Sequence, residues 1–174
     1  MRALFALEHD GLSLLYEVGI GEELSLDLSL RNAGGAPRTV EAALHTSLAV
    51  GDVTAVSITG LEGARYSDRL TDEERVQDGP VRFSGRVDRI YRARGPVAVT
   101  DPAGRRRIVV TGVRAPNAVV WNPWNRVAAT MADLGEEWPS MVCVESAAVR
   151  DRAVRLEPGE STSLGARIGV EPLA

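Results

Sequence analysis

The chain has 174 residues, of which 24 are acidic and 20 are basic, and its net charge is −4. This negative charge argues against non-specific nucleic-acid binding. The clusters of arginine in the chain also lack the interleaved aromatic residues of a stacking platform. The hydrophobic content of 44% is that of an ordinary globule, and no apolar run is long enough to cross a bilayer. We expect one domain over residues 1–174, with neither nucleic acid nor a membrane as a partner.

The amino end is apolar only as far as Leu7, because Glu8, His9 and Asp10 follow it. This stretch is too short for a secretory signal. Cys143 is the single cysteine, so it has no disulfide partner within the chain, and a reducing compartment suits it. We therefore expect a cytoplasmic protein. One cysteine and two histidines also argue against a zinc cluster, and we expect neither a metal nor a cofactor.

Apolar and polar residues alternate without a miss from Leu24 to Arg31, which is the period of a half-buried strand. The turn-forming residues Asn32, Gly34 and Gly35 follow. Comparable runs predict strands at residues 12–18, 39–50, 53–58, 87–91, 97–100, 107–111, 118–121, 141–147 and 163–170. Gly, Pro and Asp residues separate these runs, which predicts an all-β antiparallel sandwich or barrel. A helical pattern occurs once, over residues 125–134.

His45 follows the apolar residues 42–44 in a strand-like context. An imidazole can donate or accept a proton near neutral pH, which makes this residue a candidate acid or base. Taken alone, it is better explained as a hydrogen-bonded core histidine. His9 is different, because it lies in a polar turn where a solvated role is expected.

Asp88 lies within a strand pattern next to an apolar residue. It can accept hydrogen bonds from sugar hydroxyls, or it can form an ion pair with Arg86 or Arg92, and the pattern favours neither. Trp121 and Trp124 flank an Asn-Pro turn. They are either a stacking platform for a sugar ring or a lid over the core, and the lid is the commoner arrangement.

Glu145 stands at the end of the apolar run 141–144. Strand alternation places it on one face with Met141 and Cys143. An ionised carboxylate without partners costs several kcal/mol to bury, so such groups are paired, neutralised or placed in a functional cleft. Two interpretations stay open: Glu145 marks a strand end or pairs with a buried arginine, or it acts as a base together with His45 as an acid.

Six short motifs follow one another in the order Ala43–Thr46, Ser57–Leu61, Val87–Tyr91, Val120–Trp124, Met131–Asp133 and Met141–Glu145. In this order they resemble the glucose-6-phosphate 1-epimerases, the hexose-6-phosphate mutarotase branch of the aldose 1-epimerase family. The resemblance covers almost the whole chain.

The resemblance implies an antiparallel β-supersandwich of the galactose mutarotase-like type, with an open sugar cleft. It also implies metal-free interconversion of the α and β anomers of a hexose 6-phosphate. His45 matches the acid of the family, Glu145 matches the base, and Asp88 matches the aspartate that binds sugar hydroxyls. The expected partner is therefore a hexose phosphate or another sugar.

The chain departs from the family pattern in two ways. Ser47 and Leu48 stand where the family usually has two aromatic residues. The opening strands of the family, with the arginines that hold the phosphate, have no counterpart, so no arginine of this chain is assigned to phosphate. A supersandwich without these strands exposes a sheet edge and an apolar face, which predicts self-association through that edge. The alternative function is a catalytically inactive carbohydrate-binding remnant.

Overall fold

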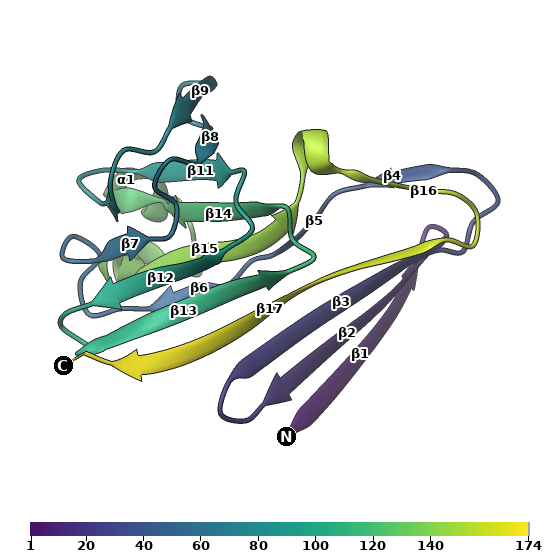
Figure 1. Ribbon diagram of the computed structural model, residues 1–174, viewed down its shortest axis with the longest axis horizontal. Coiled ribbons are helices and arrows are strands. Elements are labelled where there is room, and N and C mark those ends of the chain that lie inside the picture. The colour runs from purple at the N-terminus through teal and green to yellow at the C-terminus, as the bar shows by residue number, and fades with distance from the viewer. Residues whose placement is uncertain (174) are drawn as a thin grey trace.

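The computed structural model describes residues 1–173 as two antiparallel sheets and a two-stranded ribbon (Figure 1). The larger sheet has eight strands, in the spatial order β1 (Arg2–His9), β2 (Leu12–Ile20), β3 (Leu24–Asn32), β17 (Ser161–Pro172), β13 (Arg106–Val113), β12 (Pro96–Asp101), β7 (Ser57–Thr59) and β10 (Val81–Arg82). Every neighbouring pair in it is antiparallel.

The smaller sheet has seven strands, in the order β5 (Ala42–Leu44), β15 (Met141–Ala148), β14 (Asn117–Asn122), β11 (Val87–Tyr91), β8 (Arg65–Asp68) and β9 (Glu73–Val76), with β6 (Ser47–Ala49) also paired to β15. The ribbon consists of β4 (Arg38–Val40) and β16 (Val154–Leu156). The helices are α1 (Trp124–Ala128) and the 3-10 turns η1 (Gly135–Ser140) and η2 (Arg150–Arg152). No helix among residues 1–173 is long and apolar enough to cross a membrane.

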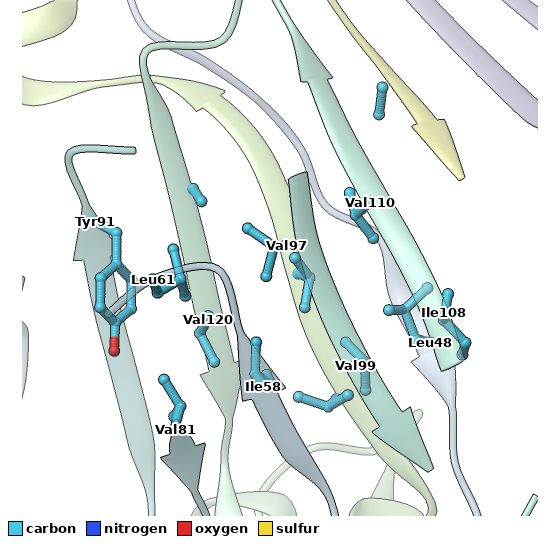
Figure 2. Close-up of a cluster of buried hydrophobic side chains, with 14 of the residues drawn as sticks. Leu48, Ile58, Leu61, Val81, Tyr91, Val97, Val99, Ile108, Val110 and Val120 are labelled. Atoms are coloured by element: carbon cyan, nitrogen blue, oxygen red, sulfur yellow. The ribbon is translucent and has the colours of Figure 1, made fainter. Parts of the chain in front are cut away.

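One cluster of buried side chains joins the inner faces of the two sheets (Figure 2). Val97 and Ile108 reach it from the larger sheet, while Tyr91 and Val120 reach it from the smaller one. Burying a side chain of this kind contributes about 1.5–3 kcal/mol relative to leaving it exposed. The alternating pattern of β3 follows from this arrangement, because its leucines, at every second position, belong to the cluster or pack against it. The antiparallel β architecture expected from the sequence is confirmed.

Three predicted elements are wrong in detail. Residues 39–50 were expected to form one strand, but the three short strands β4, β5 and β6 take its place. Residues 53–58 were expected to form a strand, but a carboxylate oxygen of Asp52 accepts hydrogen bonds from the amide and the hydroxyl of Thr54. These bonds make a turn, and the strand begins only at Ser57. The helix expected over residues 125–134 ends at Ala128. By contrast, the strand at residues 87–91 has the predicted bounds.

Asn122 fixes the connection between β14 and β15. Its side-chain amide nitrogen donates to the carbonyl oxygens of Trp138, at 2.9 Å, and Met141, at 2.8 Å. Its side-chain oxygen accepts from the amide of Trp124 at 2.9 Å. A buried amide with all of these partners ties the turn after β14 to the start of β15. The connection therefore sets where the strand that carries Glu145 begins.

The strand β1 forms a free edge of the larger sheet. All eight of its residues are exposed, and they include the apolar residues Leu4, Phe5 and Leu7. In Figure 1, β1 to β3 are the purple and blue strands beyond β17. The exposed edge and apolar face expected from the sequence are thus present among the described residues.

Candidate active site

Glu145 lies within β15, the most deeply buried strand of the smaller sheet. Val142 and Val144 point into the core between the sheets, so Cys143 and Glu145 point to the opposite face. Glu145 is buried although its face lies away from the core. The sequence pattern therefore placed this carboxylate correctly in a buried strand.

His45 lies in a two-residue break between β5 and β6. The sequence favoured one strand over residues 39–50 with a buried histidine, and this expectation is wrong because the side chain of His45 is 61% exposed. Leu44 of β5 pairs with Ser146 of β15, and Ser47 of β6 pairs with Cys143 of β15. The same register, carried through the break, places His45 opposite Glu145.

The two side chains are in contact. His45 Nε2 lies 3.4 Å from Glu145 Oε1. Burial raises the pKa of the Glu145 carboxyl above its ordinary value, nearby His45 partly offsets this by lowering it, and Asp88 raises it further. A carboxylate whose charged form is destabilised is a stronger base than an exposed one, and the exposed imidazole beside it is within reach of a ligand from solvent.

The imidazole of His45 has two further neighbours. Its Nδ1 lies 3.7 Å from the sulfur of Cys143. The ring of Trp121 meets it edge to face, with 5.8 Å between the ring centres and 69° between the planes. The other tryptophan of the motif has a different role. Trp124 packs against the core and against Trp138, with 4.5 Å between the centres of the two rings. The lid interpretation therefore fits Trp124, while Trp121 borders the candidate site.

Asp88 lies on the same face of the smaller sheet. It pairs with Trp121 on β14, and Trp121 pairs with Cys143 on β15, so the three residues form one row across the strands. Burial raises the pKa of the Asp88 carboxyl, and nearby Arg86, at 3.5 Å, opposes this shift. Asp88 is half-buried and points to the face that carries Glu145, where it can accept hydrogen bonds from a hydroxylated ligand.

His45, Cys143 and Glu145 are also the residues that could hold a metal ion, because one ligand atom from each lies within 4.8 Å of the others. The two ring nitrogens of His45 face different partners, however, with Nδ1 toward sulfur and Nε2 toward the carboxylate. The geometry suits a ring held between two hydrogen-bonding partners better than three ligands of one ion.

Arginine recurs in two clusters of the sequence, within residues 82–94 and at residues 105–107. The arginines of the first cluster do not gather at this site as a group. Arg89 lies 3.7 Å from the carboxylate of Asp68 and covers the ring of Tyr66, with 4.9 Å from its guanidinium carbon to the ring centre. In the second cluster, Arg106 bonds to buried Asp101 at 3.2 Å. Both arginines therefore stabilise the fold.

Ser47 was not recognised as a site residue from the sequence. Its hydroxyl oxygen lies 3.3 Å from the sulfur of Cys143. The alternation of β15 already put Cys143 on the face of Glu145, but no sequence signal shows that β6 pairs with this part of β15.

The sequence pattern of the aldose 1-epimerase family matches residues 11–169. The chain belongs to this family. A curated relative from Cenchrus ciliaris, named "Putative glucose-6-phosphate 1-epimerase", is 38% identical over 149 residues, which are 82% of this chain and 45% of the relative. A relative of the same name from Escherichia coli K12 is 34% identical over 143 residues, 80% of this chain and 47% of the relative. The chain thus spans about half the length of these relatives.

Solved structures confirm the fold. The Salmonella typhimurium protein YeaD, described as "a putative mutarotase", superimposes with a TM-score of 0.87 over 98% of this chain and 60% of its own, at 24% identity. A galactose mutarotase-like protein from Clostridium acetobutylicum gives a TM-score of 0.69 at 12% identity, over 99% of this chain and 62% of its own. The expected galactose mutarotase-like fold is therefore confirmed.

Proposed function

We propose that this protein interconverts the α and β anomers of a hexose 6-phosphate, with His45 as the acid, Glu145 as the base and Asp88 as a ligand for sugar hydroxyls. The observation that carries the proposal is the 3.4 Å contact between a buried carboxylate and an exposed imidazole on one face of the sheet. Family membership supports the reaction type.

The chemistry needs one base and one acid. The Glu145 carboxylate removes the proton of the anomeric hydroxyl while the His45 imidazolium gives a proton to the ring oxygen, so the C1–O5 bond breaks and the open aldehyde forms. Rotation about the C1–C2 bond presents the other face of the carbonyl. Closure then returns both protons, with the roles of the two residues reversed. Positioned acid–base groups typically contribute about 10²–10⁴-fold to the rate.

We propose a phosphorylated hexose as the substrate because the curated relatives carry a glucose-6-phosphate 1-epimerase name. A cytoplasmic location belongs to it as well, supported by the free thiol of Cys143.

A second candidate function is binding of a carbohydrate without catalysis. It is favoured by one observation, that Asp88 and Trp121 pair on neighbouring strands on the face that also carries Glu145. Such a protein would keep Asp88 and Trp121 as a sugar-facing row and would lack turnover.

Magnetisation-transfer NMR of glucose 6-phosphate tests the proposal. The folded protein is expected to exchange the two anomeric signals faster than buffer does, and to act on unphosphorylated glucose less efficiently. Equal rates for the two sugars would refute the phosphate specificity while leaving the reaction in place. Saturable binding of glucose 6-phosphate without anomer exchange would select the binding function. A titration with the sugar that shows no binding would exclude both the epimerase and the binding function.

A further inference from the structure

The contacts of Cys143 continue beyond His45. Cys143 pairs with Ser47 on β6 and with Trp121 on β14, so the three residues form one row across neighbouring strands, with Cys143 in the middle. Its side chain is fully buried. The sulfur lies 3.3 Å from the Ser47 hydroxyl and 3.7 Å from His45 Nδ1. The hydroxyl, the thiol and the imidazole therefore form a chain of contacts that ends at Glu145.

We propose that Cys143, supported by Ser47, is a positioning residue that holds the His45 ring with Nε2 toward Glu145 and the substrate. The inference rests on the proposed function for its kinetic part, because it assigns the proton transfer to Nε2. It concerns the orientation of the ring itself, which can be measured without turnover.

A neutral thiol suits this position in both protonation states of the histidine. The thiol stays protonated because burial raises its pKa to about 11. The acid gives up its proton from Nε2, so Nδ1 carries a proton both in the imidazolium and in the neutral imidazole that results. The sulfur can accept the Nδ1 proton in both states while the thiol turns its own proton toward the Ser47 oxygen. Nδ1 keeps a partner throughout the cycle.

The exposure of His45 makes such an anchor necessary. A side chain that is 61% exposed has room to change rotamer or to rotate its ring, which would turn Nε2 away from the carboxylate. The edge contact with Trp121 limits one direction of movement. The sulfur supplies the polar contact that distinguishes Nδ1 from Nε2, and the hydrogen bond of one ring nitrogen sets the role of the other.

The test compares Cys143→Ala, Cys143→Ser and Ser47→Ala with a control, Val144→Ala, which shortens the adjacent residue of β15 on its core face. Cys143→Ala is expected to lower kcat by roughly 10- to 100-fold, the loss that a misplaced reacting group causes, with KM close to that of the wild type. Cys143→Ser should restore part of kcat, because a hydroxyl keeps both the donor and the acceptor. Val144→Ala should lower the free energy of unfolding and leave kcat near the wild-type value.

Nitrogen-15 NMR of the two histidines measures the hydrogen bonding of the His45 ring nitrogens directly. Wild-type His45 Nδ1 should show the shift of a hydrogen-bonded nitrogen, and in Cys143→Ala it should move toward the shift of exposed His9 in the same sample. An unchanged His45 spectrum together with wild-type kcat would overturn the proposal. If the wild type has no epimerase activity, the proposed function fails, and the spectrum alone still decides whether Cys143 holds the ring.

Discussion

Glu145 and His45 face each other across one pair of strands in opposite environments, since the carboxylate side chain is 8% exposed and the imidazole is 61% exposed. The carboxylate is held by a buried strand, while the imidazole sits in the break between β5 and β6. A base whose pKa is raised by burial and an acid open to solvent are thereby brought to 3.4 Å. This pairing gives the first prediction.

Replacing either residue by glutamine should remove one proton-transfer step. His45→Gln and Glu145→Gln are each expected to lower kcat for anomer exchange by roughly 10²–10⁴-fold. His9→Gln is the matched control, because His9 is exposed and lies on the other sheet. Exchange rates of glucose 6-phosphate measured by NMR decide the assignment, and full activity in either site variant would refute that residue's role.

The buried carboxylate should also cost stability at neutral pH. Because its pKa is higher in the folded protein than in the unfolded chain, the folded state binds this proton more tightly. Stability therefore falls as pH rises through the range between the two pKa values, and the cost persists above it. In Glu145→Gln the side chain at this position carries no charge, so we expect the variant to be more stable than the wild type at pH 7. The difference between their free energies of unfolding should become smaller in acid.

Urea unfolding of both proteins at pH 7 and pH 4 measures this difference. A wild type that is more stable than Glu145→Gln at pH 7 would show that the contact with His45 outweighs the cost of burial.

Asp88 should affect substrate binding more than the chemical step. Asp88→Asn keeps the size of the side chain and removes the charge that strengthens hydrogen bonds to hydroxyls, so KM should rise by roughly tenfold or more. Asp78→Asn is a suitable control, because Asp78 is exposed in a loop outside the site. Steady-state rates over a range of substrate concentration separate the two parameters. A loss confined to kcat would contradict the binding role.

Much of this arrangement could be predicted from the local alternation of apolar and polar residues. The 87–91 strand and the burial of Glu145 follow from a period of two, which depends only on neighbouring residues. The break at His45 could not be predicted, because it depends on how β5 and β6 pair with a strand about a hundred residues away. The contact between Ser47 and Cys143 has the same long-range origin. The strand β1 could not be predicted in this way, because its apolar residues 3–7 are consecutive and show no period of two.

The core between the sheets should be sensitive to cavities. Leu61 is 1% exposed and lies against the cluster shown in Figure 2, so Leu61→Ala is expected to lower the free energy of unfolding by about 2–5 kcal/mol. Leu70→Ala is the matched control, because Leu70 is 41% exposed, and it should change stability by less than about 0.5 kcal/mol. Equal urea midpoints for the two variants would contradict the assignment of Leu61 to the core.

The free edge of β1 should allow two copies of the chain to associate by strand pairing. The amino group and the carbonyl oxygen of Met1 both bond to Ile20, so the backbone groups of alternate residues, Arg2, Leu4, Ala6 and Glu8, point away from β2. A two-fold pairing centred on Phe5 would place these outward groups opposite one another, with each Arg2 opposite a Glu8. Opposite charges across such a pair are favourable.

Ala6→Pro tests this pairing, because proline removes an outward amide without removing a bond to β2. The loss of the two symmetry-related hydrogen bonds should raise the dissociation constant of the dimer by roughly tenfold or more, as measured by sedimentation. Ala6→Val is the control, because it keeps the amide and should associate like the wild type. Association that survives in Ala6→Pro would point instead to packing between the apolar faces of β1 to β3, and a monomeric wild type would rule out both arrangements.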